Sequence, residues 1–107
     1  MSVEMTKGKA VHIVVNATFE RQLIKLLKQA EVTGYTQLDA RGFGYSGEQD
    51  GHSEGETNVL FIVLVTTEKA QQIEESLVSY INRGYPIVSY MTDADVLTTN
   101  KYRKPTI

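Results

Sequence analysis

A glycine-rich stretch from Ala40 to Asn58 holds the residues best suited to bind a ligand, and it reads ARGFGYSGEQDGHSEGETN. Near its start, Arg41 offers a fixed positive charge and a planar fork of donors that matches phosphate or carboxylate. Gly42 and Gly44 let backbone N–H groups approach an anion closely and form a concave nest. The G-x-G spacing is weak evidence by itself, because glycines also serve loop geometry and a solvated Arg41 needs no ligand. The group nevertheless favours contact with a phosphate or another small anion.

Two further groups of residues could take part in an anion site. The turn Arg83-Gly84-Tyr85-Pro86 has the glycine that ends a helix and the proline that prevents its resumption. It is fully explained as a helix stop. In the alternative interpretation, its backbone amides and Arg83 line the wall of a nucleotide site. Near the C-terminus, the three cations Lys101, Arg103 and Lys104 beside Tyr102 could clamp a di- or triphosphate, although basic termini are more often solvated.

The sequence gives little support for catalysis or for a metal site. Ser46 and Ser53 have no evident base beside them, and a polar, glycine-rich loop is a poor setting for the raised pKa that a general acid needs. The two histidines, His12 and His52, have no spaced partner ligand, and the absence of cysteine excludes thiolate sites and disulfides. We therefore expect no catalytic residue and no bound metal.

Composition limits the class of protein further. The chain has 107 residues and a net charge of −2, so it lacks the basic field of a nucleic-acid-binding domain. Its first residues do not form a signal peptide. The longest apolar run, Val59 to Val65, is too short to span a bilayer. We expect a cytoplasmic protein that associates with a membrane or a carboxysome only through a partner.

The hydrophobic pattern of the first half predicts a strand, a helix and a strand. Ala10–Val15 is apolar on nearly both faces, as a buried central strand would be. Asn16 or Thr18 can cap a helix that starts near Phe19. Gly34 suits the left-handed position that ends this helix, and a strand follows to Ala40.

The second half repeats the order at an offset of 50 residues, so that Gly34-Tyr35 matches Gly84-Tyr85. A second apolar strand covers Val59–Val65, and Thr66 or Thr67 caps the helix after it. The last predicted strand, Ile87–Met91, mixes apolar and polar residues as an edge strand does.

This order predicts an α+β fold of ferredoxin-like type, βαββαβ, because right-handed crossovers place both helices on one face of an antiparallel sheet. We expect one domain over residues 1–107, with a flexible N-terminus at 1–8, a long loop at 41–57 between the second and third strands, and a C-terminal tail at 95–107. The two apolar strands should lie in the centre, and their second face should pack against other subunits.

A chain of this length with Gly34-Tyr35-Thr36 after the first helix, Arg41-Gly42-Phe43-Gly44 at the base of the long loop and a basic tail resembles the PII-like signalling proteins. The resemblance spans residues 9–104. It is strongest for the branch linked to inorganic-carbon uptake, the SbtB and carboxysome-associated PII-like (CPII) proteins. The turn Arg83-Gly84-Tyr85-Pro86 departs from the glycine- and lysine-rich signature of nitrogen-regulatory PII proteins. Sensing of ATP with 2-oxoglutarate is therefore not implied, and neither is uridylylation of Tyr45.

The resemblance implies a regulatory homotrimer, not an enzyme, that binds adenine nucleotides in clefts between neighbouring subunits. The implied ligands are AMP or ADP, with ATP and cAMP as further adenine nucleotides, and bicarbonate. Ligand would select one conformation of the long, T-loop-like segment, which would then contact or release a bicarbonate transporter or a carboxysome component. By position, the implied nucleotide-binding residues are Arg41, Gly42, Gly44, Gly84, Tyr85, Lys101 and Arg103, with bicarbonate at Arg41 and Gly42.

Three alternatives share this fold class. An acylphosphatase-like hydrolase would use Arg41 to hold phosphate, but it also needs a placed asparagine and a water. An RNA-binding module needs exposed aromatic residues on its central strands, where only Phe61 stands. A metal-tolerance trimer of the CutA type fits poorly with the absence of cysteine and with the long glycine-rich loop.

Overall fold

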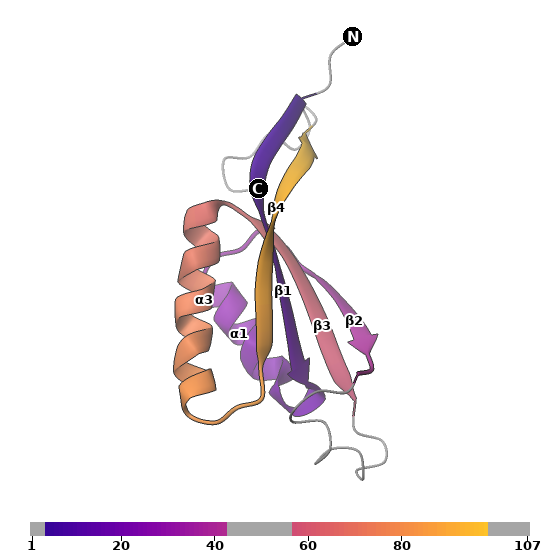
Figure 1. Ribbon diagram of the computed structural model, residues 1–107, viewed down its shortest axis with the longest axis vertical. Helices are drawn as coiled ribbons and strands as arrows, with labels where there is room; N and C mark the ends of the chain where they lie inside the picture. Colours follow the sequence, from indigo (N-terminus) through magenta and orange to yellow (C-terminus); the bar gives the residue numbers. More distant parts are fainter. Residues whose placement is uncertain (1–3, 43–56, 99–107) are drawn as a thin grey trace.

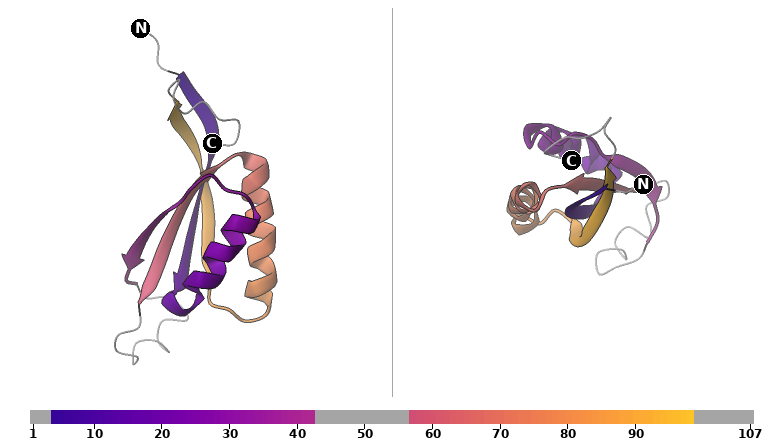
Figure 2. Two further views of the ribbon diagram at one scale, coloured as in Figure 1. Left: turned by 180° about the vertical axis from the view of Figure 1, so that it is seen from behind. Right: turned by 90° about the horizontal axis from the view of Figure 1, so that it is seen from above.

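The computed structural model describes residues 4–42 and 57–98 of the chain. Four strands form one antiparallel sheet in the order β2-β3-β1-β4, and the two α-helices cover one of its faces (Figures 1 and 2). This arrangement confirms the predicted ferredoxin-like α+β fold with the two apolar strands in the centre. The elements are β1 (Glu4–Asn16), the 3₁₀ turn η1 (Ala17–Phe19), α1 (Glu20–Gln29), β2 (Thr36–Ala40), β3 (Asn58–Val65), α3 (Thr67–Asn82) and β4 (Val88–Thr98).

The hydrophobic core lies between the sheet and the helices. Alternate side chains of β1 and β3 point into this layer, and the ring of Phe61 is fully buried there. Leu23 and Leu27 of α1 and Ile73 and Leu77 of α3 have no exposed surface. Burial of side chains of this size contributes about 1.5–3 kcal/mol each, so this layer fixes the helices on the sheet.

A side-chain cap begins the helical segment that follows each central strand: η1 after β1 and α3 after β3. The Oδ1 atom of Asn16 accepts a hydrogen bond from the Thr18 amide at 2.8 Å. It therefore caps η1, and α1 begins only at Glu20. The hydroxyl of Thr66 accepts from the Lys69 amide at 3.1 Å and caps α3, as predicted.

The end of α1 differs from the prediction that Gly34 takes the left-handed position. The helix ends at Gln29, and Glu31 is the residue with a left-handed backbone, at φ 60°. Such a conformation costs a residue with a Cβ about 1–2 kcal/mol. The ammonium group of Lys69, from the other helix, donates to the carbonyl of Ala30 at 2.6 Å and satisfies a helix-end acceptor. This long-range bond favours the earlier end, and the local sequence gives no sign of it.

The central strand β1 and the edge strand β4 continue past the helices as a two-stranded ribbon (Figure 1). Glu4 pairs with Thr98 at its far end. Two ion pairs cross the ribbon, Lys7 with Asp95 at 3.2 Å and Lys9 with Asp93 at 2.6 Å. Opposite charges directly across an antiparallel pair stabilise its register.

The ribbon corrects two expectations about the chain ends. Residues 4–8 belong to β1, so the prediction of a frayed N-terminus is wrong for them. The last strand does not end at Met91 but continues to Thr98, so it includes the first part of the predicted tail at 95–107. Each half of the ribbon looks polar and irregular by itself, and only its pairing with the other half makes it a strand.

Leu27→Ala is expected to lower the free energy of unfolding by about 2–5 kcal/mol, because it removes a buried side chain and leaves a cavity. Val78→Ala is the matched control: Val78 is 47% exposed on α3, so its truncation should change stability by less than about 0.5 kcal/mol. Urea titration at one fixed protein concentration measures both. Equal losses for the two variants would contradict this placement of the core.

Lys9→Met is expected to raise the pKa of Asp93 toward its ordinary value. The hydrogen bond from Lys9, and then its charge and that of Lys7, lower the pKa of the Asp93 carboxyl. A lowered pKa in the folded chain means that this pair favours folding above the pKa of the unfolded carboxyl, and that the effect is lost as pH falls through the lower, folded value. Titration of the carboxyl carbon signal by NMR measures the shift, and Lys25→Met should leave it unchanged.

Candidate functional site

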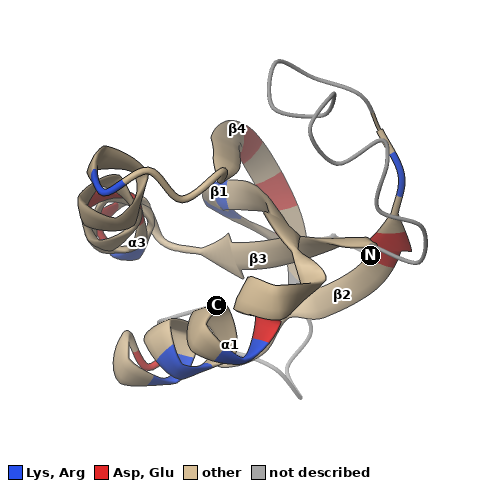
Figure 3. Ribbon diagram, turned by 90° about the horizontal axis from the view of Figure 1, so that it is seen from below, with Lys and Arg blue, Asp and Glu red and all other residues tan. Residues whose placement is uncertain are grey.

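The segments that carry the candidate residues meet at one end of the molecule. There β1 and β2 end, β3 and β4 begin, and α3 turns into β4 (Figure 1). Arg41 and Gly42 follow β2 at one edge of the sheet, while Gly84 and Tyr85 precede β4 at the opposite edge. Figure 3 looks at this end and shows α3 and β2 on opposite sides of β3.

Arg41 is available to bind an anion. Its side chain is exposed, and within residues 4–42 and 57–98 it forms no ion pair. A Cβ added to the neighbouring Gly42 would meet no atom of residues 4–42 and 57–98 within 4 Å, so contacts with these residues do not require glycine at this position. Gly44, the third residue of the predicted anion nest, lies outside the described residues.

The turn after α3 is built around Gly84. Gly84 has φ 99°, a conformation that side chains with a Cβ rarely adopt. Its amide donates to the carbonyl of Ile81 at 2.9 Å, and the amide of Tyr85 donates to the carbonyl of Tyr80 at 3.1 Å. These two bonds form the Schellman motif, which closes a helix with a left-handed residue.

The Schellman bonds limit what this turn can offer a ligand. The amides of Arg83, Gly84 and Tyr85 all donate to carbonyls of the last helical turn. The predicted helix stop is therefore confirmed, and the alternative, in which these amides line a nucleotide site, is not supported. The groups still available are the guanidinium of Arg83 and the ring of Tyr85, which is 43% exposed.

Tyr85 is held in an aromatic cluster that the sequence analysis did not identify. Its ring centroid lies 5.2 Å from that of Phe19 and 5.5 Å from that of Tyr80, and the Phe19 and Tyr80 rings are themselves 5.2 Å apart. The guanidinium of Arg83 lies 4.5 Å from the Tyr80 ring centroid, within the range of a cation–π contact. The Schellman motif itself brings Tyr85 next to Tyr80, whereas Phe19 comes from a distant segment that no local motif could have indicated.

A single chain keeps its two candidate segments apart. Three strand spacings of about 4.8 Å, or roughly 14 Å in total, separate the edge strands β2 and β4. Arg41 and Tyr85 of one copy therefore lie at opposite edges of the sheet. Lys101 and Arg103, the predicted tail contributions, lie outside the described residues.

The sheet face opposite the helices is uncharged over its central part. Strand register and alternation place on it residues of all four strands. Four of them, Leu38, Leu64, Val88 and Tyr90, are between 41% and 53% exposed. This helix-free face consists of Ala10, His12, Val14, Thr36, Leu38, Ala40, Leu60, Ile62, Leu64, Val88, Tyr90 and Thr92.

His12 is the one histidine on this face. Its ring stacks on Tyr90, with centroids 4.7 Å apart and planes 3° from parallel. Its Nδ1 atom is buried and has no hydrogen-bond partner among the described residues. A buried polar atom without a partner is unusual in a folded protein, which indicates that this face is incomplete in a single chain.

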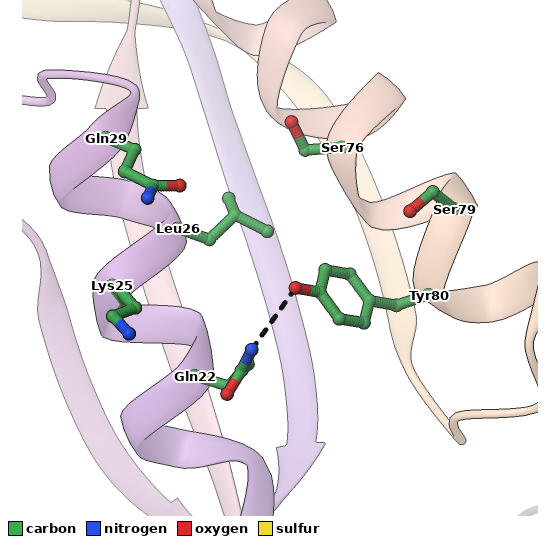
Figure 4. A pocket seen from close by; sticks show the side chains of 7 residues that line it. All are labelled: Gln22, Lys25, Leu26, Gln29, Ser76, Ser79 and Tyr80. Atoms are coloured by element: carbon green, nitrogen blue, oxygen red, sulfur yellow. Dashed lines mark hydrogen bonds between the residues drawn. The ribbon is translucent and has the colours of Figure 1, made fainter.

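A polar groove runs between the two helices (Figure 4). It encloses about 420 Å³. The hydroxyl of Tyr80 accepts a hydrogen bond from Nε2 of Gln22 across it, at 3.3 Å. Hydroxyl and amide groups dominate the groove and Lys25 is its one charged residue, so it shows no strong preference for a particular ligand. Its lining residues are Gln22, Lys25, Leu26, Gln29, Ser76, Ser79 and Tyr80.

The described residues lack two further kinds of feature. They contain no group of three or more histidine, cysteine or acidic side chains placed to hold a metal ion. Neither α1 nor α3 has the length and apolar character needed to cross a membrane.

A family model described as nitrogen regulatory protein P-II matches residues 8–101 of the chain. Comparison with curated proteins found no match. Among solved structures, a PII-like signalling protein from Thermus thermophilus is 27% identical, with a TM-score of 0.74 over 92% of this chain and 98% of that chain.

Structures of CPII from Thiomonas intermedia, a nitrogen regulatory PII-like protein, share the same fold. The form bound to ADP and bicarbonate has a TM-score of 0.80 and 22% identity, over 95% of this chain and 100% of that one. The form bound to ADP, AMP and bicarbonate has a TM-score of 0.79 and 20% identity, over 96% of this chain and 100% of that one.

Proposed function

Because the chain belongs to the nitrogen regulatory protein P-II family, we propose that it is a signalling protein that senses AMP or ADP, together with bicarbonate, at clefts between the subunits of a homotrimer. The observation that carries this proposal is the exposed Arg41, without an ion pair among the described residues, at the root of the long segment in a fold shared with CPII bound to ADP and bicarbonate. In this proposal, ligand binding controls a partner that serves inorganic-carbon uptake or carboxysome function.

The chemistry of the described residues fits an anionic nucleotide. Arg41 can donate two parallel hydrogen bonds to a phosphate or to the planar bicarbonate ion. Gly42 leaves open space beside it for a ligand. The exposed part of the Tyr85 ring offers an apolar wall for a base or ribose, next to the fixed backbone of Gly84. Gly44, Lys101 and Arg103 remain predicted contributors.

The separation of these groups favours a site formed by two copies. One chain places Arg41 and Tyr85 at opposite sheet edges. In a closed ring of subunits, one edge of each copy meets the other edge of its neighbour, so that both groups can border one cleft. The uncharged helix-free face supplies a surface for such an assembly, since burial of its exposed apolar side chains would stabilise the contact.

Arg41→Ala is expected to weaken binding of ADP by about tenfold to a hundredfold, because it removes charge-assisted hydrogen bonds worth about 1.5–3 kcal/mol. The effect of bicarbonate on that affinity should be lost as well. Isothermal titration calorimetry of AMP and ADP, each with and without bicarbonate, measures both effects.

Lys28→Ala serves as the control for the calorimetry, because it also removes an exposed cation, and Lys28 lies in the last turn of α1, at the opposite end of that helix from η1. An unchanged affinity in Arg41→Ala would remove the loop base from the site. Absence of binding of any adenine nucleotide to the unaltered protein would refute the proposed function itself.

Leu64→Asp is expected to convert the trimer to monomers, because it places a charge within an apolar contact without a partner. Leu64 is 41% exposed in a single chain, so the variant should still fold. Val88→Asp, across the same face, should act alike, whereas Val78→Asp on the outer surface of α3 should remain trimeric. Analytical ultracentrifugation distinguishes the states, and a trimeric Leu64→Asp would show that the helix-free face is not the contact.

A further inference from the structure

The turn η1 lies between the two candidate segments and contacts the elements next to both. At one end of the turn, the amide of Ala17 donates to the carbonyl of Thr57 at 2.8 Å. At the other end, the ring of Phe19 packs on those of Tyr80 and Tyr85. The first contact extends the β1–β3 register one step past the pair Asn16–Asn58, and the second reaches α3 and the turn after it, so η1 contacts both sides.

Thr57 and Arg41 flank the end of the β2–β3 ladder. The last ladder pair of β2 and β3 is Ala40 with Asn58. Arg41 directly follows Ala40 in the chain, and Thr57 directly precedes Asn58. The carbonyl that accepts from η1 therefore belongs to the backbone next to the candidate anion-binding residue.

The Tyr85 side of the link is tightly defined. Phe19 is only 8% exposed. Its ring meets Tyr80 edge-on at 74° and Tyr85 at 49°, and Tyr80 meets Tyr85 at 78°, so that each ring contacts the other two. Such edge-to-face contacts are directional. The Schellman bond from the Tyr85 amide fixes the backbone of Tyr85. It does not fix the side-chain torsions, so the contact with Phe19 helps to set the orientation of the Tyr85 ring.

The turn itself is preorganised. Oδ1 of Asn16 accepts from both the amide and the hydroxyl of Thr18, each at 2.8 Å. Asn16 also ends β1 and pairs with Asn58 of β3. A turn fixed in this way can pass a displacement at Phe19 to Ala17 instead of absorbing it.

We infer that Phe19 is a positioning residue of the candidate nucleotide site: it orients the Tyr85 ring and, through η1, ties that wall to Thr57 beside Arg41. The inference rests on the proposed function, in which Tyr85 and Arg41 of one chain border different clefts. It therefore names a route by which a ligand against the α3–β4 turn in one cleft affects the root of the long segment at the next cleft. Phe19 itself touches no ligand in this scheme. Its effect on binding passes through Tyr85 and through the Ala17–Thr57 hydrogen bond.

Phe19→Leu tests the inference, because it keeps an apolar side chain in the core and removes the ring contacts. We expect ADP affinity to fall by about tenfold, from the loss of the aromatic contact that orients Tyr85. Leu27→Val is the matched control: it alters a fully buried core residue that lies outside the aromatic cluster. Its ADP affinity should stay within about twofold of that of the unaltered protein, because the contacts to Tyr85 are retained.

Amide hydrogen exchange at Ala17 supplies a readout that a purely structural role would not change. At saturating ADP, exchange of this amide should slow in the unaltered protein and in Leu27→Val, but not in Phe19→Leu. Unchanged ADP affinity in Phe19→Leu, or equal slowing in all three proteins, would overturn the inference.

The free protein separates this inference from the proposed function. Without ligand, Phe19→Leu should shift the NMR ring signals of Tyr85 and speed exchange at Ala17 several-fold more than Leu27→Val does. If no adenine nucleotide binds the unaltered protein, the proposed function fails, while these two measurements still decide whether Phe19 ties Tyr85 to Thr57. No difference between the variants in the free state would refute the tie.

Discussion

The two central strands carry apolar side chains on both faces, and this constraint shapes the rest of the molecule. On one face, α1 and α3 bury the alternate residues of β1 and β3 almost completely. On the other face, Ile62 and Val14 stand among uncharged neighbours that no described element covers. A sheet with two apolar faces and helices on one of them needs a second layer, and another copy of the same sheet is the simplest layer that matches it. In the middle of that face, the buried Nδ1 atom of His12 has no hydrogen-bond partner among the described residues, which also indicates that a covering layer is missing.

The sequence predicted what depends on periodicity and missed what depends on contacts between distant segments. The offset of 50 residues held for the core, where Leu23 and Ile73 are both fully buried. It failed at the helix ends, because Gly84 takes the left-handed position but Gly34 does not. The second helix closes through its own backbone, whereas the first closes with help from Lys69 of the other helix. The β1–β4 ribbon was missed for the same reason, since the ion pair of Lys7 joins residues 88 positions apart.

The candidate site shows the same division. Arg41 and Gly42 could be chosen from residue type and loop position, and the structure leaves both exposed at the root of the long segment. The role of the turn after α3 could be decided only from the structure. Its amides could bind a ligand or close the helix, and the observed hydrogen bonds show that they close the helix. The aromatic cluster around Tyr85 needed the structure too. Tyr80 and Tyr85 meet through the helix-ending motif, but Phe19 comes from η1, and no spacing in the sequence brings it to them.

The two strands that hold the long segment differ in how firmly they are anchored. The segment leaves from β2, a short edge strand that pairs only with β3 and has all but one of its five residues exposed. It returns into β3, which is paired on both sides and buries every second side chain. Few buried contacts mean a low free energy of local opening, so β2 is the weaker anchor, and Arg41 follows it directly. A ligand held by Arg41 would therefore act on the end of the segment that moves most easily. Thr57 lies on the more firmly anchored side, because it precedes β3 and its carbonyl accepts the hydrogen bond from Ala17.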